Sequence, residues 1–113
     1  MHELSITESL LRIALSEAEK HGAKKITTIR IVVGELSQVE PLSVQFYLDV
    51  LGKGTIAEGA QLQSRLVPLR AACRACGEQF GVSEFKFACP KCGAGETDVV
   101  AGREMYLDSI EVE

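Results

Sequence analysis

The 113-residue sequence has no apolar run that approaches the roughly 20 residues needed to cross a membrane. Its net charge of −4 is opposite in sign to the basic surface typical of proteins that bind nucleic acids. Its start, Met-His-Glu, lacks the charged region and the cleavage site of a secretory signal peptide. These absences argue against a membrane protein, a nucleic-acid-binding protein and a secreted protein.

The sequence also contains little that supports catalysis. It has only two histidines, no nucleophile accompanied by a base, and no paired carboxylates on one helix face. Residues 52–55, Gly-Lys-Gly-Thr, lack the upstream glycine and the Lys-Ser/Thr order of a phosphate-binding loop. We therefore predict that the protein is not an enzyme and that residues 52–55 form a turn.

Against these absences stands a doubled Cys-x-x-Cys pattern that contains every cysteine of the chain: Cys73, Cys76, Cys89 and Cys92. Each pair can present two thiolates from one tight turn, so two pairs can surround one zinc ion tetrahedrally. The twelve-residue spacer is slightly shorter than in most zinc ribbons, but the doubled pair is typical of a metal site. Gly77 and Gly93 can let the backbone fold its N–H groups toward the sulfurs. Disulfides or a redox dithiol are the alternatives.

A site closed by four thiolates has no open coordination position, so its zinc would be structural. Residues 70–102 are too few to bury an adequate core, and zinc binding, worth about 10–16 kcal/mol in small zinc peptides, would supply the missing stability. We expect Phe80, Phe85 and Phe87 to pack beside the cysteines, with stacking on nucleic-acid bases as the alternative. Reduced cysteines are typical of the cytosol, so we expect a cytoplasmic protein.

Two helices are predicted outside the cysteine segment. Apolar residues recur at helical spacing over residues 4–20, and Ser5 with Glu8 fits a capping box at the start of this helix. His21-Gly22 fits its end, and a role for His21 as a metal ligand is not expected. Pro41 suits the first position of a second helix that runs to residue 52.

Three strands are predicted, over residues 26–33, 61–66 and 105–112, and the alternation of the last one slips near Ser109, which suggests a bulge. Because the last strand follows the cysteine segment and must rejoin the sheet, that segment is an insertion. We predict an α+β fold in which a small three-stranded sheet carries two helices on one face. Residues 1–69 and 103–113 form this domain, and residues 70–102 form an inserted zinc-ribbon module built on the four cysteines.

The first three residues offer a second kind of metal site. The terminal amine of Met1, the backbone nitrogen of His2 and its imidazole can form fused chelate rings around one ion. Nickel(II) and copper(II) prefer nitrogen donors in a plane. A fourth donor could be the backbone nitrogen of Glu3 or a carboxylate such as Glu35 or Glu40. The alternative is that His2 is a mobile terminal residue with no metal role.

Three motifs together resemble the HypA/HybF family of nickel metallochaperones for hydrogenase maturation: Met1-His2-Glu3, Val33-Gly34-Glu35-Leu36-Ser37 and the four cysteines. The resemblance runs through the whole chain in order. It implies transferable Ni²⁺ in a nickel domain anchored on His2, and structural Zn²⁺ on the cysteines. It also implies delivery of nickel to the large subunit of [NiFe]-hydrogenase with a partner GTPase, and in some organisms support of urease and its accessory proteins.

Carried over by position, the resemblance makes His2 the nickel ligand and Glu3 a contributor of backbone nitrogen or carboxylate. Glu40 lies where family members have an acidic residue near the nickel, as a ligand or a neighbour of the ligands. The cysteine segment contains no histidine, so histidine exchange into the zinc shell does not apply here. The competing prediction is a zinc-ribbon adaptor for protein interactions without transferable metal, which does not explain the Met-His-Glu start. The chain could be a monomer or a homodimer.

Overall fold

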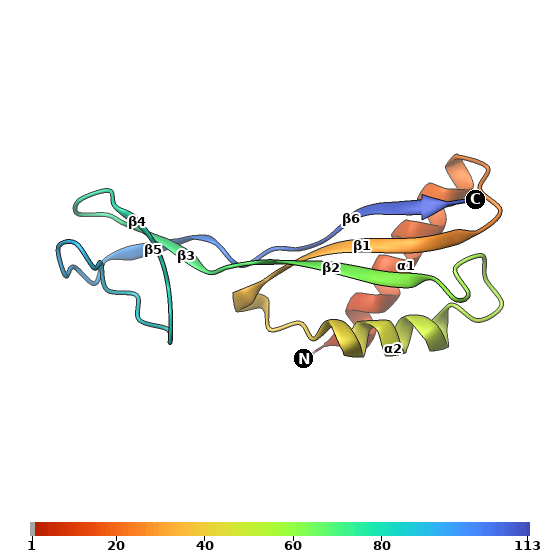
Figure 1. Ribbon diagram of the computed structural model, residues 1–113, viewed down its shortest axis with the longest axis horizontal. Coiled ribbons are helices and arrows are strands. Elements are labelled where there is room, and N and C mark those ends of the chain that lie inside the picture. Colours follow the sequence, from red (N-terminus) through yellow and green to blue (C-terminus); the bar gives the residue numbers. More distant parts are fainter. Residues whose placement is uncertain (1) are drawn as a thin grey trace.

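The computed structural model describes residues 2–113, which form an elongated molecule of 55 × 25 × 16 Å with a three-stranded sheet toward each end (Figure 1). The larger sheet has the order β2-β1-β6, and the smaller sheet has the order β4-β3-β5. The strands of the larger sheet are β1 (Ile26–Gly34), β2 (Gln61–Val67) and β6 (Met105–Val112). Those of the smaller sheet are β3 (Arg70–Cys73), β4 (Gln79–Gly81) and β5 (Thr97–Ala101). The predicted α+β fold and its three-stranded sheet are confirmed.

Two helices pack on one face of the larger sheet: α1 (Glu3–Lys20) and α2 (Pro41–Leu51). Alternate residues of β1 (Ile29, Ile31 and Val33) join both helices in one buried core. As predicted, Pro41 starts α2, and α1 ends at His21 followed by Gly22, whose φ of +64° suits glycine. The predicted capping box is wrong, because α1 begins at Glu3 and the Ser5 hydroxyl donates to the His2 carbonyl at 3.0 Å.

The central strand β1 is buried on both of its faces. Val32 points away from the helices and is nevertheless only 1% exposed. It is paired with Arg65 on one side and Tyr106 on the other. Because β1 has a strand on both sides, long neighbouring side chains shield it where no helix does.

The slip in the last strand is a genuine irregularity of the pairing. Arg30 pairs with Ser109 while the next residue, Ile31, pairs with Leu107, so Asp108 is an extra residue in β6. Such a bulge shifts the alternation by one position. As a result Leu107 and Ile110, three residues apart, both pack against the core under α1.

The segment from Gly34 through the short 3₁₀ helix η1 (Glu35–Ser37) joins the two sheets. The Glu35 carboxylate accepts a hydrogen bond from the Leu69 N–H at 2.8 Å, and the Leu36 N–H donates to the Gly102 carbonyl at 2.7 Å. The Leu36 side chain packs against the buried cluster of the smaller sheet. These side-chain and backbone contacts hold the two sheets to one another.

Gly34 leads to the first prediction, because a Cβ at this position would lie 2.2 Å from both the carbonyl carbon and oxygen of Gly102. Backbone atoms cannot move aside as a flexible side chain can, so we expect Gly34→Ala to lower the free energy of unfolding by about 3 kcal/mol. The matched control is Gly95→Ala, where no atom lies within 4 Å of the added Cβ. Urea denaturation compares the two variants, and equal stabilities would contradict the close approach.

Candidate metal centres

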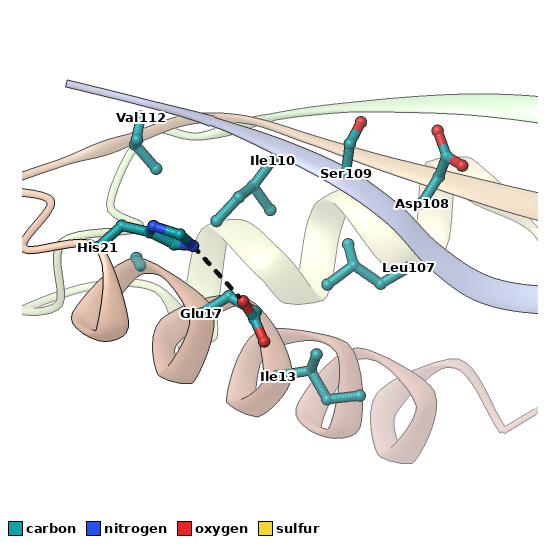
Figure 2. Close-up of a pocket in the computed structure, with 9 residues that line it drawn as sticks. Ile13, Glu17, His21, Leu107, Asp108, Ser109, Ile110 and Val112 are labelled. Atoms are coloured by element: carbon teal, nitrogen blue, oxygen red, sulfur yellow. Dashed lines mark ion pairs between the residues drawn. The ribbon is translucent and has the colours of Figure 1, made fainter.

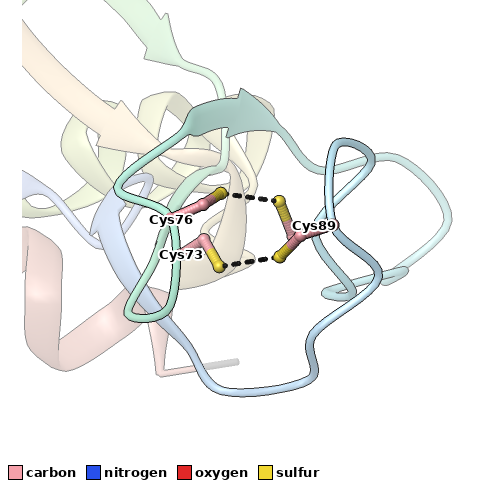
Figure 3. Close-up of side chains that lie close together, drawn as sticks. Cys73, Cys76 and Cys89 are labelled. Carbon is pink, nitrogen blue, oxygen red and sulfur yellow. Dashed lines mark hydrogen bonds between the residues drawn. The ribbon is translucent and has the colours of Figure 1, made fainter.

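The fold brings all four cysteine sulfurs together at the smaller sheet (Figure 3). The Sγ atoms of Cys73 and Cys92 are 3.6 Å apart, as are those of Cys76 and Cys89, and all four lie within 4.8 Å of one another. Four sulfurs bound to one zinc at about 2.3 Å would be separated by about 3.8 Å. The thiol set and its spacing therefore fit a tetrahedral zinc ion.

Both Cys-x-x-Cys pairs lie in turns of the same design. Gly77 and Gly93 follow the pairs with a φ of +78°, which glycine adopts without strain. As predicted, the backbone of both turns folds N–H groups toward the sulfurs, although the N–H groups of the two glycines themselves donate to the carbonyls of Cys73 (3.0 Å) and Cys89 (2.8 Å). The sulfurs accept hydrogen bonds from other backbone N–H groups of the same turns: Ala75, Cys76, Glu78, Lys91, Cys92 and Ala94.

These hydrogen bonds make the four thiols unequal. The Cys92 and Lys91 N–H groups lower the pKa of Cys89 to about 7, although burial opposes this. The Ala94 N–H is the largest single influence on Cys92 and lowers its pKa, but hydrogen bonds with the other three thiols and burial together raise the pKa to about 12. Four thiolates at this spacing repel one another, so a bound divalent cation is what would allow all of them to ionise together.

The packing around the cysteines was predicted only in part. Phe80 is buried in the cluster with Cys73 and Cys89, and Phe87 packs against it. The prediction for Phe85 is wrong, because this residue is 63% exposed and is not part of the buried cluster that contains Cys73 and Cys89. An Arg74–Asp98 pair was not predicted, since nothing in the sequence indicates which strand faces the first cysteine turn.

The Arg74–Asp98 pair fixes the first cysteine turn to β5. The guanidinium donates from both Nε (3.0 Å) and Nη2 (2.6 Å) to the Asp98 carboxylate, and the Arg74 N–H donates to the Glu96 carbonyl at 2.9 Å. The side-chain hydrogen bond from Arg74 also lowers the pKa of Asp98. The pair is solvent-exposed, so we attribute to it orientation of the turn and no more than a small part of the stability.

The second candidate site lies at the start of α1. His2 is exposed and occupies the position that precedes the helix, and Glu3 is its first residue. A helix start leaves its first backbone N–H groups without intrahelical acceptors, and such a nitrogen can bind a metal ion once it has lost its proton. The Met1 amine, also a predicted donor, lies outside the described residues.

The structure brings Glu3 and Glu40 together, although they are 37 residues apart in the sequence. The Glu40 N–H donates to the Glu3 carboxylate at 3.1 Å, and the Glu40 carboxylate accepts from the Leu42 N–H at 3.4 Å as the N-terminal cap of α2. Glu3 is buried in spite of its charge, with a relative exposure of 7%. The two helix starts therefore meet beside His2, with two carboxylates facing their positive ends.

Other predicted donors are directed elsewhere. The Glu35 carboxylate binds the Leu69 N–H at the junction of the sheets. His21 lies at the far end of α1, whose 18 residues span about 27 Å. Within residues 2–113, the four cysteines form a group of side-chain donors close enough to hold a metal, and His2, Glu3 and Glu40 do not. Any ion at the chain start would thus depend on backbone nitrogens or on movement of side chains.

Among the described residues, no helix combines the length and the apolar character needed to cross a membrane.

Sequence comparison matches residues 1–112 to a protein family described as "Hydrogenase/urease nickel incorporation, metallochaperone, hypA". A hydrogenase maturation factor HypA of Caldanaerobacter subterraneus is 46% identical over the full length of both chains. A second, from Dehalococcoides mccartyi, is 42% identical and covers all of this chain and 95% of its own.

Two solved structures share the fold. The solution structure of the Ni metallochaperone HypA from Helicobacter pylori superposes with a TM-score of 0.68 at 24% identity, covering 99% of this chain and 97% of that one. Another, described as the solution structure of HypA protein, has a TM-score of 0.76 at 24% identity, covering 100% of this chain and 97% of that one. At this identity the two structures support the architecture of both sheets.

Proposed function

Because the chain belongs to the HypA family of metallochaperones for hydrogenase and urease nickel incorporation, we propose that it binds Ni²⁺ at its first residues and delivers the ion to the large subunit of [NiFe]-hydrogenase. The observation that carries this proposal is the contact between Glu3 and Glu40 beside His2, which brings two glutamates to the first residues, where rotation of a side chain would add a carboxylate to the nitrogens of His2. Nickel(II) favours such nitrogen donors.

The proposed ligands are the Met1 amine, the backbone nitrogen and imidazole of His2, and the backbone nitrogen of Glu3. The Glu3 carboxylate accepts from the Glu40 N–H, so we assign it the task of holding the chain start against α2. Glu40 is exposed, and within residues 2–113 its carboxylate accepts one long hydrogen bond, of 3.4 Å, from the Leu42 N–H. It is therefore the side chain best suited to turn toward an ion as a fourth ligand.

The four cysteines are proposed to hold a structural Zn²⁺ that stabilises residues 70–102, while residues 1–69 and 103–113 carry the nickel. A terminal nickel site suits a carrier, because its ligands can be drawn into a partner without unfolding the core. The proposed partners are the hydrogenase large subunit, the nickel-inserting GTPase and, in some organisms, urease accessory proteins. The proposed compartment is the cytoplasm, where cysteines stay reduced.

A zinc-ribbon adaptor without transferable metal is the competing function, and the metal content of the untagged protein separates the two. A carrier should hold one zinc that resists dialysis and one nickel that a mild chelator removes, whereas an adaptor should hold zinc alone. The nickel-loaded protein should also show the d–d absorption of nitrogen-coordinated nickel. Native mass spectrometry that finds zinc and no nickel after loading would contradict the carrier and leave the adaptor.

A further inference from the structure

An apolar groove runs between α1 and β6, at the edge of the larger sheet opposite the edge beside α2 (Figure 2). It consists of two adjoining cavities of about 440 and 470 Å³, which share Ile13 and Leu107 in their walls. Ile13 is 50% exposed although it lies in the middle of the groove. The groove therefore contains a row of apolar positions that no part of residues 2–113 covers.

Beside this groove β6 forms one edge of the sheet, and the two edges of the sheet differ. At the opposite edge, the Gln45 side chain of α2 accepts from the Leu62 N–H of β2 at 2.7 Å and donates to the carbonyl of Ala60, the residue before β2, at 3.2 Å. Figure 1 shows α2 lying along that edge. In the described part of the chain no strand pairs with the outer side of β6, whose backbone groups can accept an added strand.

The charge of this edge is of one sign. Residues 104–113 include four carboxylates and no basic side chain: Glu104, Asp108, Glu111 and Glu113. Glu104 accepts from the Gly102 N–H and Glu111 pairs with Arg30, but no hydrogen bond or ion pair within residues 2–113 involves the Asp108 carboxylate. Figure 2 shows Leu107 and Ile110 pointing toward α1, and Asp108 pointing away from it.

We propose that the outer edge of β6 binds an extended segment of a partner protein, in which apolar residues alternate with lysine or arginine. Added as a fourth strand, such a segment would direct one row of side chains into the groove and the other toward Asp108, because strand residues alternate between the two faces. A second copy of this chain is disfavoured, since pairing β6 with β6 would bring carboxylates together. The surface contains no proposed metal ligand, so this proposal can be tested independently of nickel binding.

A short acetylated peptide of alternating lysine and valine tests the proposal. Fluorescence anisotropy should give an affinity that falls by about tenfold or more for Ile13→Arg and stays within about twofold for Phe46→Arg. Phe46 is the matched control, because it is 61% exposed on α2 and the substitution changes the net charge equally. Equal weakening by the two variants would mean non-specific attraction and would overturn the proposal.

Two further comparisons keep the test decisive if Ile13→Arg alters the fold. Asp108→Lys should weaken binding of the peptide. Glu78→Lys should not, because Glu78 is an exposed acidic residue in the module of the smaller sheet. Two further peptides carry N-methyl groups on the odd-numbered or on the even-numbered amides. Only every second amide of an added strand faces β6, so one of these two peptides should lose binding. Full binding by both would exclude strand addition. A dimer that Ile13→Arg abolishes would identify a second copy as the occupant and would also overturn the proposal. Nickel and zinc contents should be unchanged in every variant.

Discussion

Replacing Cys76 with alanine should unfold the smaller sheet as completely as replacing Cys73, although Cys76 is exposed and Cys73 is only 4% exposed. If the cysteines mattered through packing alone, the exposed side chain would change stability by less than about 0.5 kcal/mol. If both are zinc ligands, either loss removes the metal, which contributes about 10 kcal/mol or more in small zinc-dependent folds.

Hydrogen exchange followed by mass spectrometry separates these alternatives strand by strand. Amides of β3, β4 and β5 should lose protection in both variants, while those of β1 and β2 keep it, because the larger sheet has a buried core of its own. Zinc content should fall from one equivalent to none in both. A Cys76→Ala protein that keeps its zinc and a protected smaller sheet would disprove the structural zinc site.

One extra residue placed before Met1 should weaken nickel binding by about a hundredfold or more and leave the zinc in place. The extension moves the terminal amine out of the chelate rings, and donors that act together on one ion lose far more affinity than any single contact is worth. His2→Ala should have a comparable effect for the same reason. Isothermal titration of the zinc-loaded proteins with nickel measures both.

His21→Ala is the matched control, because it removes the same side chain from the other end of α1, about 27 Å away along its 18 residues. It should bind nickel as the unaltered protein does. All variants should retain their helix content by circular dichroism, because His2 makes no side-chain cap of α1. An extended protein that still held one nickel tightly would place the site somewhere other than the chain start.

The cysteine motif could be recognised in the sequence because the residues of each pair lie close together along the chain. Two Cys-x-x-Cys pairs each place their sulfurs within one turn, so their spacing predicts a shared ion before any fold is known. The helices and the three strands of the larger sheet also followed from periodicity, and the bulge at Asp108 showed itself as a slip in alternation. Strands β3, β4 and β5 have three to five residues each, too few for alternation to reveal them.

The amino-acid order alone was enough to predict that the four cysteines form one group and which segments form helices and long strands, because both predictions depend on neighbours a few positions apart. Only the tertiary structure shows that the Glu3 carboxylate binds the Glu40 N–H and that Phe85 is exposed. It also shows that Glu35 binds the Leu69 N–H between the two sheets and does not lie at the chain start. The open edge of β6 likewise depends on strand order. The two glutamate contacts join residues more than thirty positions apart, and local periodicity and spacing carry no information about which such residues will meet.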